Sequence, residues 1–245
     1  MVTGRLSFAF LAWYLLTAAF FVVDEAFCAS LNIIAFGDSI TTGYPYYPAW
    51  DVEDGAGNGS TGGGYEPVTG TDLANNGVEA IVFNWGQSGE FASDGVNRLE
   101  SVLSGHQADY VLLMEGTNDL TFFLGCRSVV EDLSLMIDKI IAHGAIPLLS
   151  TLTPDTREGT WYKYIGNCNE QIRALAADKG VSLVDNYQAV VADWQSLTYD
   201  DLHPNTAGYS VLGKTWSSGI QKKIHELELE AMQGKTIPCL MMLLK

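Results

Sequence analysis

A serine, an aspartate and a histidine in this sequence have the types and spacing that could activate a hydroxyl group. Ser39 directly follows a short apolar run, and far downstream Asp200 lies three residues before His203. A hydroxyl is a weak nucleophile until an imidazole takes its proton, and a carboxylate orients that imidazole and stabilises its charged form. These residues therefore predict nucleophilic attack on a carbonyl carbon, which is the chemistry of ester hydrolysis.

Two further segments carry groups that could stabilise the negative charge that such an attack creates. Gly86 lies in a segment that follows one apolar run, and Asn118 follows the next run, within Gly116-Thr117-Asn118-Asp119. A glycine lets the backbone approach a ligand closely and direct its N–H, and an asparagine side chain offers another donor. Together with the Ser39 N–H, Gly86 and Asn118 are therefore expected to form an oxyanion hole.

Taken in chain order, these segments resemble the sequence blocks of the SGNH hydrolases, also called the GDSL esterase/lipase family. The resemblance covers essentially residues 31–220. Gly37-Asp38-Ser39-Ile40 is similar to the first block, with Ile in place of the commoner Leu. The other blocks are matched by Gly86, Gly116-Thr117-Asn118-Asp119 and Asp200-x-x-His203.

The resemblance implies a role for each matched residue. Ser39 would be the nucleophile, His203 the general base and then the general acid, and Asp200 its orienting partner. Gly86 and Asn118 would complete the oxyanion hole. The resemblance also implies an enzyme that acts on ester bonds without a cofactor or metal. The implied fold is a three-layer α/β/α sandwich with a five-stranded parallel sheet, as in flavodoxin-like proteins.

The elements that must position these residues alternate between strands and helices. Helical spacing of apolar residues precedes Gly144 and again Gly180, and a last helix is predicted from about Thr206 past Leu227. Such alternation is typical of a parallel sheet, whose ligands bind outside the carboxyl ends of its strands. The expected strands span 32–36, 80–85, 110–114, 146–150 and 182–184. One domain is expected over 29–229, followed by a tail at 230–245.

The segment 43–70 departs from this alternation. It is rich in Gly, Tyr, Pro and Asn, so no regular structure is expected there. Two interpretations stay open, a flexible excursion and a loop that faces the substrate. The second is suggested by aromatic residues soon after Ser39, namely Tyr44, Tyr46, Tyr47, Trp50 and Tyr65.

Two residues compete for the assigned roles. Ser88 lies in Gly86-Gln87-Ser88-Gly89-Glu90, which is similar to the nucleophile elbow of α/β-hydrolases except that Glu90 replaces the final glycine. Asp201 lies beside Asp200 and could orient the histidine instead. Motif spacing favours Ser39 and Asp200 over both.

The ends and the cysteines bear on the compartment. Residues 1–28 have a basic start, an apolar run and the small residues Ala26 and Cys28 at their end, which predicts a signal peptide and an exported, periplasmic or secreted protein. A membrane anchor and a lipid-modified Cys28 are the alternatives. In an exported protein Cys126 and Cys168 could form a disulfide, or they could be two unpaired buried residues.

Composition limits the possible partners. The formal net charge is −16, and so acidic a surface repels phosphate backbones, which argues against nucleic-acid binding. The expected partner is a small-molecule or lipid ester, such as a lysophospholipid or a short-chain acyl ester. Acetyl esters of carbohydrates are the alternative substrates, and a non-catalytic binding module is the alternative function. No transmembrane span is expected after residue 28, and the sequence carries no signal for an oligomeric state.

Overall fold

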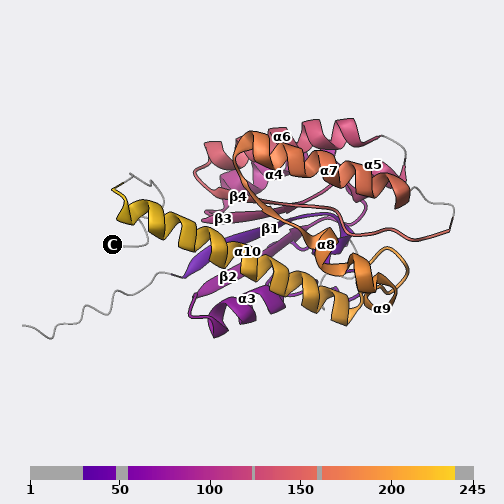
Figure 1. Ribbon diagram of the computed structural model, residues 1–245, viewed down its shortest axis with the longest axis horizontal. Helices are drawn as coiled ribbons and strands as arrows, with labels where there is room; N and C mark the ends of the chain where they lie inside the picture. The colour runs from indigo at the N-terminus through magenta and orange to yellow at the C-terminus, as the bar shows by residue number, and fades with distance from the viewer. Residues whose placement is uncertain (1–29, 48–54, 123–124, 159–161, 235–245) are drawn as a thin grey trace, which may run out of the picture.

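The computed structural model describes residues 30–47, 55–122, 125–158 and 162–234. Five parallel strands form one sheet in the order β2-β1-β3-β4-β5. This arrangement confirms the predicted parallel sheet (Figure 1). The strands are β1 (Leu31–Gly37), β2 (Ala80–Gly86), β3 (Tyr110–Met114), β4 (Ile146–Ser150) and β5 (Ser182–Val184), all at their predicted places.

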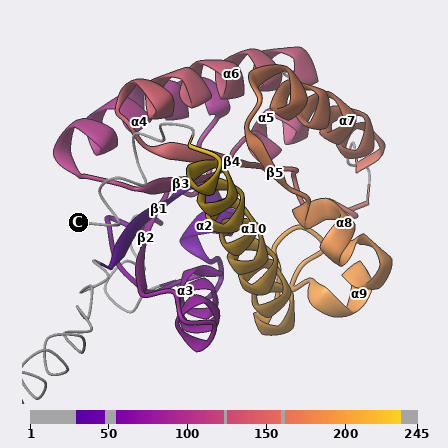
Figure 2. The same ribbon diagram turned by 60° about the vertical axis from the view of Figure 1, so that its left-hand side comes forward.

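Helices cover both faces of the sheet, which confirms the three-layer α/β/α architecture (Figure 2). One face carries α4 (Ala92–Gly105), α6 (Cys126–Ala142) and α7 (Tyr162–Lys179), and the other carries α3 (Glu66–Asn75) and α10 (Thr206–Met232). The short elements are α2 (Ser39–Thr42), α5 (Thr117–Thr121), α8 (Asn186–Val190), η2 (Val191–Asp193) and α9 (Trp194–Leu197). Because helices cover it on both sides, the central strand β3 is buried along its whole length.

The register of the central strands brings three chain segments to one edge of the sheet. Gly37, the last residue of β1, is paired with Gly86 of β2 on one side and with Met114 of β3 on the other. The carboxyl ends of the three strands are therefore level. The residues that follow them, beginning with Asp38, Gln87 and Glu115, all emerge at this edge.

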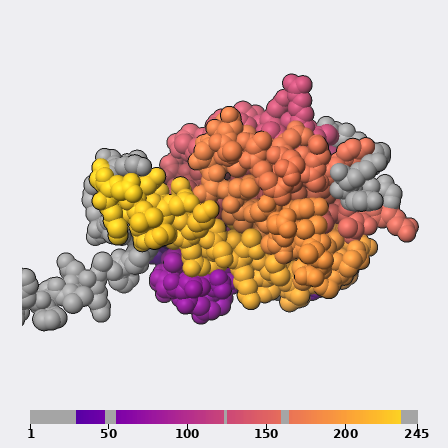
Figure 3. All heavy atoms as spheres, viewed as in Figure 1, coloured from indigo at the N-terminus to yellow at the C-terminus, as the bar shows by residue number. Residues whose placement is uncertain are grey.

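The long helix α10 begins where the sequence predicted and runs past the predicted domain boundary at residue 229. The Asn205 side chain caps it by accepting hydrogen bonds from the N–H groups of Ala207 and Gly208. Figure 3 shows α10 crossing this face of the molecule next to α3. Since α10 ends at Met232, the first residues of the predicted tail belong to the helix.

The expectation that 43–70 holds no regular structure is wrong at its end. Helix α3 begins at Glu66, and Pro67 lies in its first turn, where a proline's fixed φ suits a helix and its missing N–H costs nothing. Earlier in the segment Ala56 and Ser60 form isolated bridges with the end of β2. The glycine-rich part of this segment therefore forms turns between residues that pair with the edge of the sheet. Trp50 lies outside the described residues.

Cys126 and Cys168 form a disulfide, with their Cα atoms 5.3 Å apart, which is the first of the two possibilities that the sequence left open. Cys126 begins α6 and Cys168 lies within α7, so the bond joins two helices on the same face of the sheet. The Cys168 side chain is fully buried.

Reducing this disulfide should lower the stability of the fold. The two cysteines are 42 residues apart. In the chain-entropy model, opening a loop of that size increases the entropy of the unfolded chain and lowers the free energy of unfolding by about 4 kcal/mol. We expect dithiothreitol to lower the midpoint of urea unfolding. A Cys126→Ser/Cys168→Ser variant should start at that lower midpoint and not respond to the reductant. An unchanged wild-type midpoint would contradict the prediction.

Two further predictions concern the chain ends and the membrane. The predicted signal peptide at 1–28 lies outside the described residues. Among residues 30–47, 55–122, 125–158 and 162–234, no helix is long and apolar enough to cross a bilayer.

Candidate active site

The turn after β1 presents Ser39 at the edge of the sheet. Gly37 is required before it, because a Cβ there would lie 2.1 Å from the Met114 carbonyl oxygen. Asp38 caps α2 by accepting a hydrogen bond from the Ile40 N–H at 2.9 Å, and burial raises its pKa to about 6. Because the Asp38 side chain caps α2, the Ser39 hydroxyl is available to contact a side chain from another segment.

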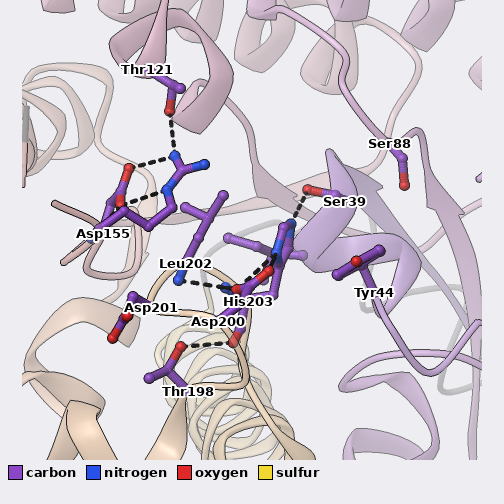
Figure 4. A network of polar contacts seen from close by, with 12 residues as sticks. Ser39, Tyr44, Ser88, Thr121, Asp155, Thr198, Asp200, Asp201, Leu202 and His203 are labelled. Atoms are coloured by element: carbon purple, nitrogen blue, oxygen red, sulfur yellow. Dashed lines mark hydrogen bonds and ion pairs between the residues drawn. The ribbon is translucent and has the colours of Figure 1, made fainter. Parts of the chain in front are cut away.

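Ser39, His203 and Asp200 form a continuous chain of hydrogen bonds (Figure 4). The Ser39 Oγ lies 2.9 Å from His203 Nε2. On the other side of the ring, His203 Nδ1 lies 2.9 Å and 3.1 Å from the two carboxylate oxygens of Asp200. The structure therefore brings together the three residues that the sequence singled out, although 164 positions separate the serine from the histidine.

The loop that carries the histidine is fixed by its own backbone. Asp200 Oδ1 accepts hydrogen bonds from the N–H groups of His203 at 2.7 Å and Leu202 at 3.2 Å. Asp201 adopts a positive φ of 68°, and its carbonyl accepts the Thr156 N–H at 2.8 Å. Asp200 rather than Asp201 is thus the partner of His203, as predicted.

The surroundings of His203 favour the neutral imidazole that a general base requires. Burial lowers the pKa of His203 below 6.5, and this effect outweighs the Asp200 carboxylate, which acts to raise it. For Asp200, partial burial acts to raise the pKa, but hydrogen bonds from His203 lower it overall. Both shifts leave the pair as imidazole and carboxylate at neutral pH.

The rate of hydrolysis should therefore rise with pH along a curve whose midpoint lies below pH 6.5. The base form of His203 accumulates as pH rises through its lowered pKa, so kcat/KM should reach half its plateau below 6.5. Asp38, with its pKa of about 6, titrates in the same range. Replacing Asp200 with asparagine identifies the group, because losing the carboxylate moves the half-point of His203 further down. A half-point above 6.5, or one that Asp200→Asn leaves in place, would contradict this prediction.

Asn118 contacts the loop after β2, and Gly86 does not offer the donor that the sequence predicted. The Asn118 Nδ2 donates to the Glu90 carbonyl at 2.8 Å, which ties α5 to the loop after β2. The Gly86 N–H instead donates to Asn84 Oδ1 at 3.0 Å. A Cβ at Gly86 would lie 2.3 Å from the Thr42 nitrogen, so this glycine permits close packing against α2. The prediction that its N–H is free for a ligand is wrong.

A second glycine, three residues later, has the properties expected of that donor. Gly89 is exposed and has a φ of 79°, and its N–H makes no hydrogen bond to any residue that the structure describes. The residues beside it are anchored, Ser88 to Thr42 at 2.9 Å and Glu90 to Asn118. The sequence signal was present, because Gly86 and Gly89 share one segment, but spacing alone did not say which backbone group stays free.

Ser88, the competing nucleophile, is engaged elsewhere. Its Oγ lies 2.9 Å from Thr42 Oγ1 and 3.1 Å from the Tyr47 hydroxyl. Figure 4 shows it apart from the hydrogen-bonded chain that includes His203. Its contacts give it a role in holding the loop after β2 against α2.

Arg98 on α4 was not predicted, yet it joins the segments that make up the site. Its guanidinium donates to the carbonyls of Trp85 at 2.7 Å and Gly37 at 3.3 Å, at the ends of β2 and β1. It also forms an ion pair with the buried carboxylate of Glu90 at 2.5 Å. Since the Glu90 carbonyl accepts from Asn118, one side chain fixes the relative positions of both loops and α5.

The sequence pattern of the GDSL-like lipase/acylhydrolase family matches residues 35–211, a stretch that contains every residue of the site. The chain belongs to this family. As a GDSL-type protein it is a serine hydrolase that acts on ester bonds.

The proteins to which this chain is similar differ in the esters that their names describe. An arylesterase from Vibrio mimicus is 25% identical over 188 residues, which cover 76% of this chain and 86% of the relative. A lipase/acylhydrolase from Enterococcus faecalis has a TM-score of 0.66 and 25% identity, over 79% of this chain and 96% of that one. An acetylxylan esterase from Geobacillus stearothermophilus has a TM-score of 0.63 and 23% identity, over 79% and 95%.

Proposed function

We propose that the protein hydrolyses carboxylic esters or thioesters through an acyl-enzyme formed on Ser39. The observation that carries this proposal is the pair of contacts on His203, 2.9 Å to the Ser39 hydroxyl and 2.9 Å to the Asp200 carboxylate. His203 takes the serine proton as the oxygen attacks the carbonyl carbon, and then gives that proton to the leaving oxygen. In the second half His203 takes a proton from the water that attacks the acyl-enzyme, and then gives that proton to the Ser39 oxygen as the bond to the acyl group breaks and the acid leaves.

The tetrahedral intermediate is stabilised by three donors in this proposal. They are the N–H of Ser39, the N–H of Gly89 and the second hydrogen of Asn118 Nδ2. Gly89 replaces Gly86 here because its N–H is unengaged among the described residues and its neighbours are tied to α2 and to Asn118. Donors fixed in this way cost no reorganisation when charge develops on the oxygen.

Asn118→Ala should lower kcat by about 10²–10³-fold, because one oxyanion donor is lost in the transition state. KM should change little, since the donor is aimed at a charge that the bound ester does not yet carry. Steady-state kinetics with p-nitrophenyl acetate separates the two constants. Asn76→Ala, which changes an exposed amide at the end of α3, is a matched control with unchanged kinetics. A rise in KM with kcat unchanged would contradict the oxyanion role.

For the substrate we propose short-chain or lipid-derived acyl esters. An exposed aromatic surface beside Asn118 supports this choice. Phe122 is 60% exposed and its ring contacts that of Phe91 at 5.6 Å between centroids. An acyl chain whose carbonyl oxygen points at Asn118 would lie over these two rings. Phe123 and Leu124, which the sequence also suggested for an acyl channel, lie outside the described residues.

An acyl-chain series tests the proposed substrate. Along p-nitrophenyl esters from acetate to dodecanoate, kcat/KM should rise with the first added methylenes and be highest among short chains, and Phe122→Ala should reduce this initial rise. The exposed tyrosines beside His203 favour carbohydrate acetyl esters as a second candidate, so acetylated xylo-oligosaccharides belong in the same assay. A preference for the oligosaccharide over every p-nitrophenyl ester would replace the first candidate with the second.

Export is the localisation that we propose. The disulfide between Cys126 and Cys168 supports it, because such bonds persist mainly in oxidising compartments. The intact mass of protein recovered from outside the cytoplasm should lack about the first 28 residues. An uncleaved chain retained in the cytoplasm would contradict export.

A further inference from the structure

We propose that Tyr44, Tyr46 and Tyr199 form the subsite for the alcohol half of the ester, and that this subsite takes a leaving group carrying a six-membered ring with an apolar face. The inference rests on the proposed hydrolysis through Ser39 and His203. It extends that proposal by naming the half of the substrate that these tyrosines recognise.

The three tyrosines form one cluster that begins at the imidazole. The Tyr44 ring lies 4.4 Å from the His203 ring, measured between centroids. Tyr199 lies 6.2 Å from Tyr44 and 6.4 Å from Tyr46, both with rings roughly perpendicular. The cluster, here called the tyrosine cluster, thus extends from His203 outward along the surface.

The backbone fixes the tyrosine cluster to the reacting groups themselves. The Tyr44 N–H donates to the Ser39 carbonyl at 3.0 Å, and the Tyr199 N–H donates to the His203 carbonyl at 2.7 Å. The Tyr209 hydroxyl donates to the Tyr44 carbonyl at 2.8 Å. Any ring bound here is therefore held at a set position relative to Ser39 Oγ and His203 Nε2, which is what a specificity subsite needs.

The chemistry of the reaction places the leaving group on this side. The leaving oxygen must accept the proton from His203 Nε2, so it lies within hydrogen-bonding reach of that ring. The carbonyl oxygen points toward Asn118 and Gly89. Figure 4 shows Tyr44 beside the imidazole, with Thr121 and Asp155 beyond its other side. The alcohol half then meets the tyrosine cluster, while the acyl half runs toward Phe91 and Phe122.

The exposed parts of the cluster have the chemistry to bind a ring. Tyr46 is 44% exposed and Tyr199 is 55% exposed, so each offers an aromatic surface to solvent. Aromatic rings pack edge-to-face or offset against other aromatic rings, and such contacts add about 0.5–1.5 kcal/mol beyond area burial. The same surfaces pack against the C–H face of a pyranose. The shared requirement is a six-membered ring with an apolar face next to the ester oxygen.

Matched acetates with different alcohols test the subsite. Phenyl acetate carries an aryl ring, an acetylated methyl xyloside carries a pyranose, and trifluoroethyl acetate carries an activated acyclic alcohol. Tyr199→Ala and Tyr46→Ala should each lower kcat/KM for a ring-bearing acetate by about 2–12-fold relative to trifluoroethyl acetate, mainly through KM. Tyr164→Ala removes a tyrosine of similar exposure on α7 and should leave this ratio unchanged.

The possible outcomes distinguish a failure of the proposed subsite from a failure of the proposed hydrolysis. A selective loss on phenyl acetate identifies an aryl leaving group, and a selective loss on the xyloside identifies a sugar. An equal loss on all three esters, or no change on any of them, would overturn the subsite while the hydrolysis stands. A change in acyl-chain preference with no change in alcohol preference would also overturn it. A wild-type protein inactive on all three esters would overturn the proposed hydrolysis, and the subsite with it.

Discussion

Replacing Ser39 with alanine should lower kcat for p-nitrophenyl acetate by about 10⁵–10⁶-fold, to the level that binding and the oxyanion donors alone provide. The hydroxyl that lies 2.9 Å from His203 Nε2 is then absent, so no acyl-enzyme can form. The fold should not change, because the Ser39 side chain is only half-buried and the cap of α2 comes from Asp38. Circular dichroism and the urea midpoint check this.

Ser88→Ala is the matched control for Ser39→Ala. It removes a hydroxyl of the same type in the same region, but one that bonds to Thr42 and Tyr47 rather than to the imidazole. We expect it to retain most of the activity. If Ser88→Ala abolished hydrolysis and Ser39→Ala did not, the nucleophile would be Ser88. Equal activity in Ser39→Ala and wild type would exclude Ser39.

Asp200→Asn should lower kcat by about 10⁴-fold while leaving KM nearly unchanged. The neutral amide carries no negative charge to stabilise the imidazolium that forms when His203 takes the serine proton. It can also hold the ring in the tautomer that leaves no acceptor for the serine proton. Asp201→Asn is the control and should keep most of the activity, since the contact of Asp201 with Thr156 runs partly through its backbone carbonyl.

The loss in Asp200→Asn should not add to the loss in Ser39→Ala. The losses caused by replacing residues that act as one catalytic unit are not additive, so the double variant should be about as slow as Ser39→Ala alone. A double variant slower by the full product of the two effects would show that Asp200 acts independently of the serine. A large loss in Asp201→Asn would move the orienting role to that neighbour.

The sequence predicts the strands and the triad because both depend on local pattern. A run such as Tyr110–Met114 is apolar throughout because helices cover both faces of the sheet, and its short length favours a strand over a buried helix. Ser39 directly follows β1, at the edge where a parallel sheet binds ligands, whereas His203 lies on the loop before α10 and was identified from its spacing to Asp200. The pairing of Cys126 with Cys168 remained one of two possibilities until the positions of α6 and α7 decided it.

Features that depend on a single hydrogen bond or on packing across the sheet are not visible in the sequence. Gly86 and Gly89 look equivalent in a motif, and only the contact of the Gly86 N–H with Asn84 separates them. Arg98 is one cation among the polar positions of a helix until its carbonyl partners on β1 and β2 are known. The start of α3 was not predicted, because the high glycine content of the segment indicated a loop although Pro67 is typical of the first turn of a helix.

Covalent labelling of the intact protein identifies the nucleophile without reference to any substrate. A fluorophosphonate ester reacts with a serine hydroxyl only where a base removes its proton, and tandem mass spectrometry of the digested protein locates the adduct. We predict one adduct per chain, on Ser39, that forms far more slowly in His203→Ala. An adduct on Ser88 or another serine, or labelling of Ser39 at the wild-type rate in His203→Ala, would contradict a hydrolase built on Ser39, His203 and Asp200.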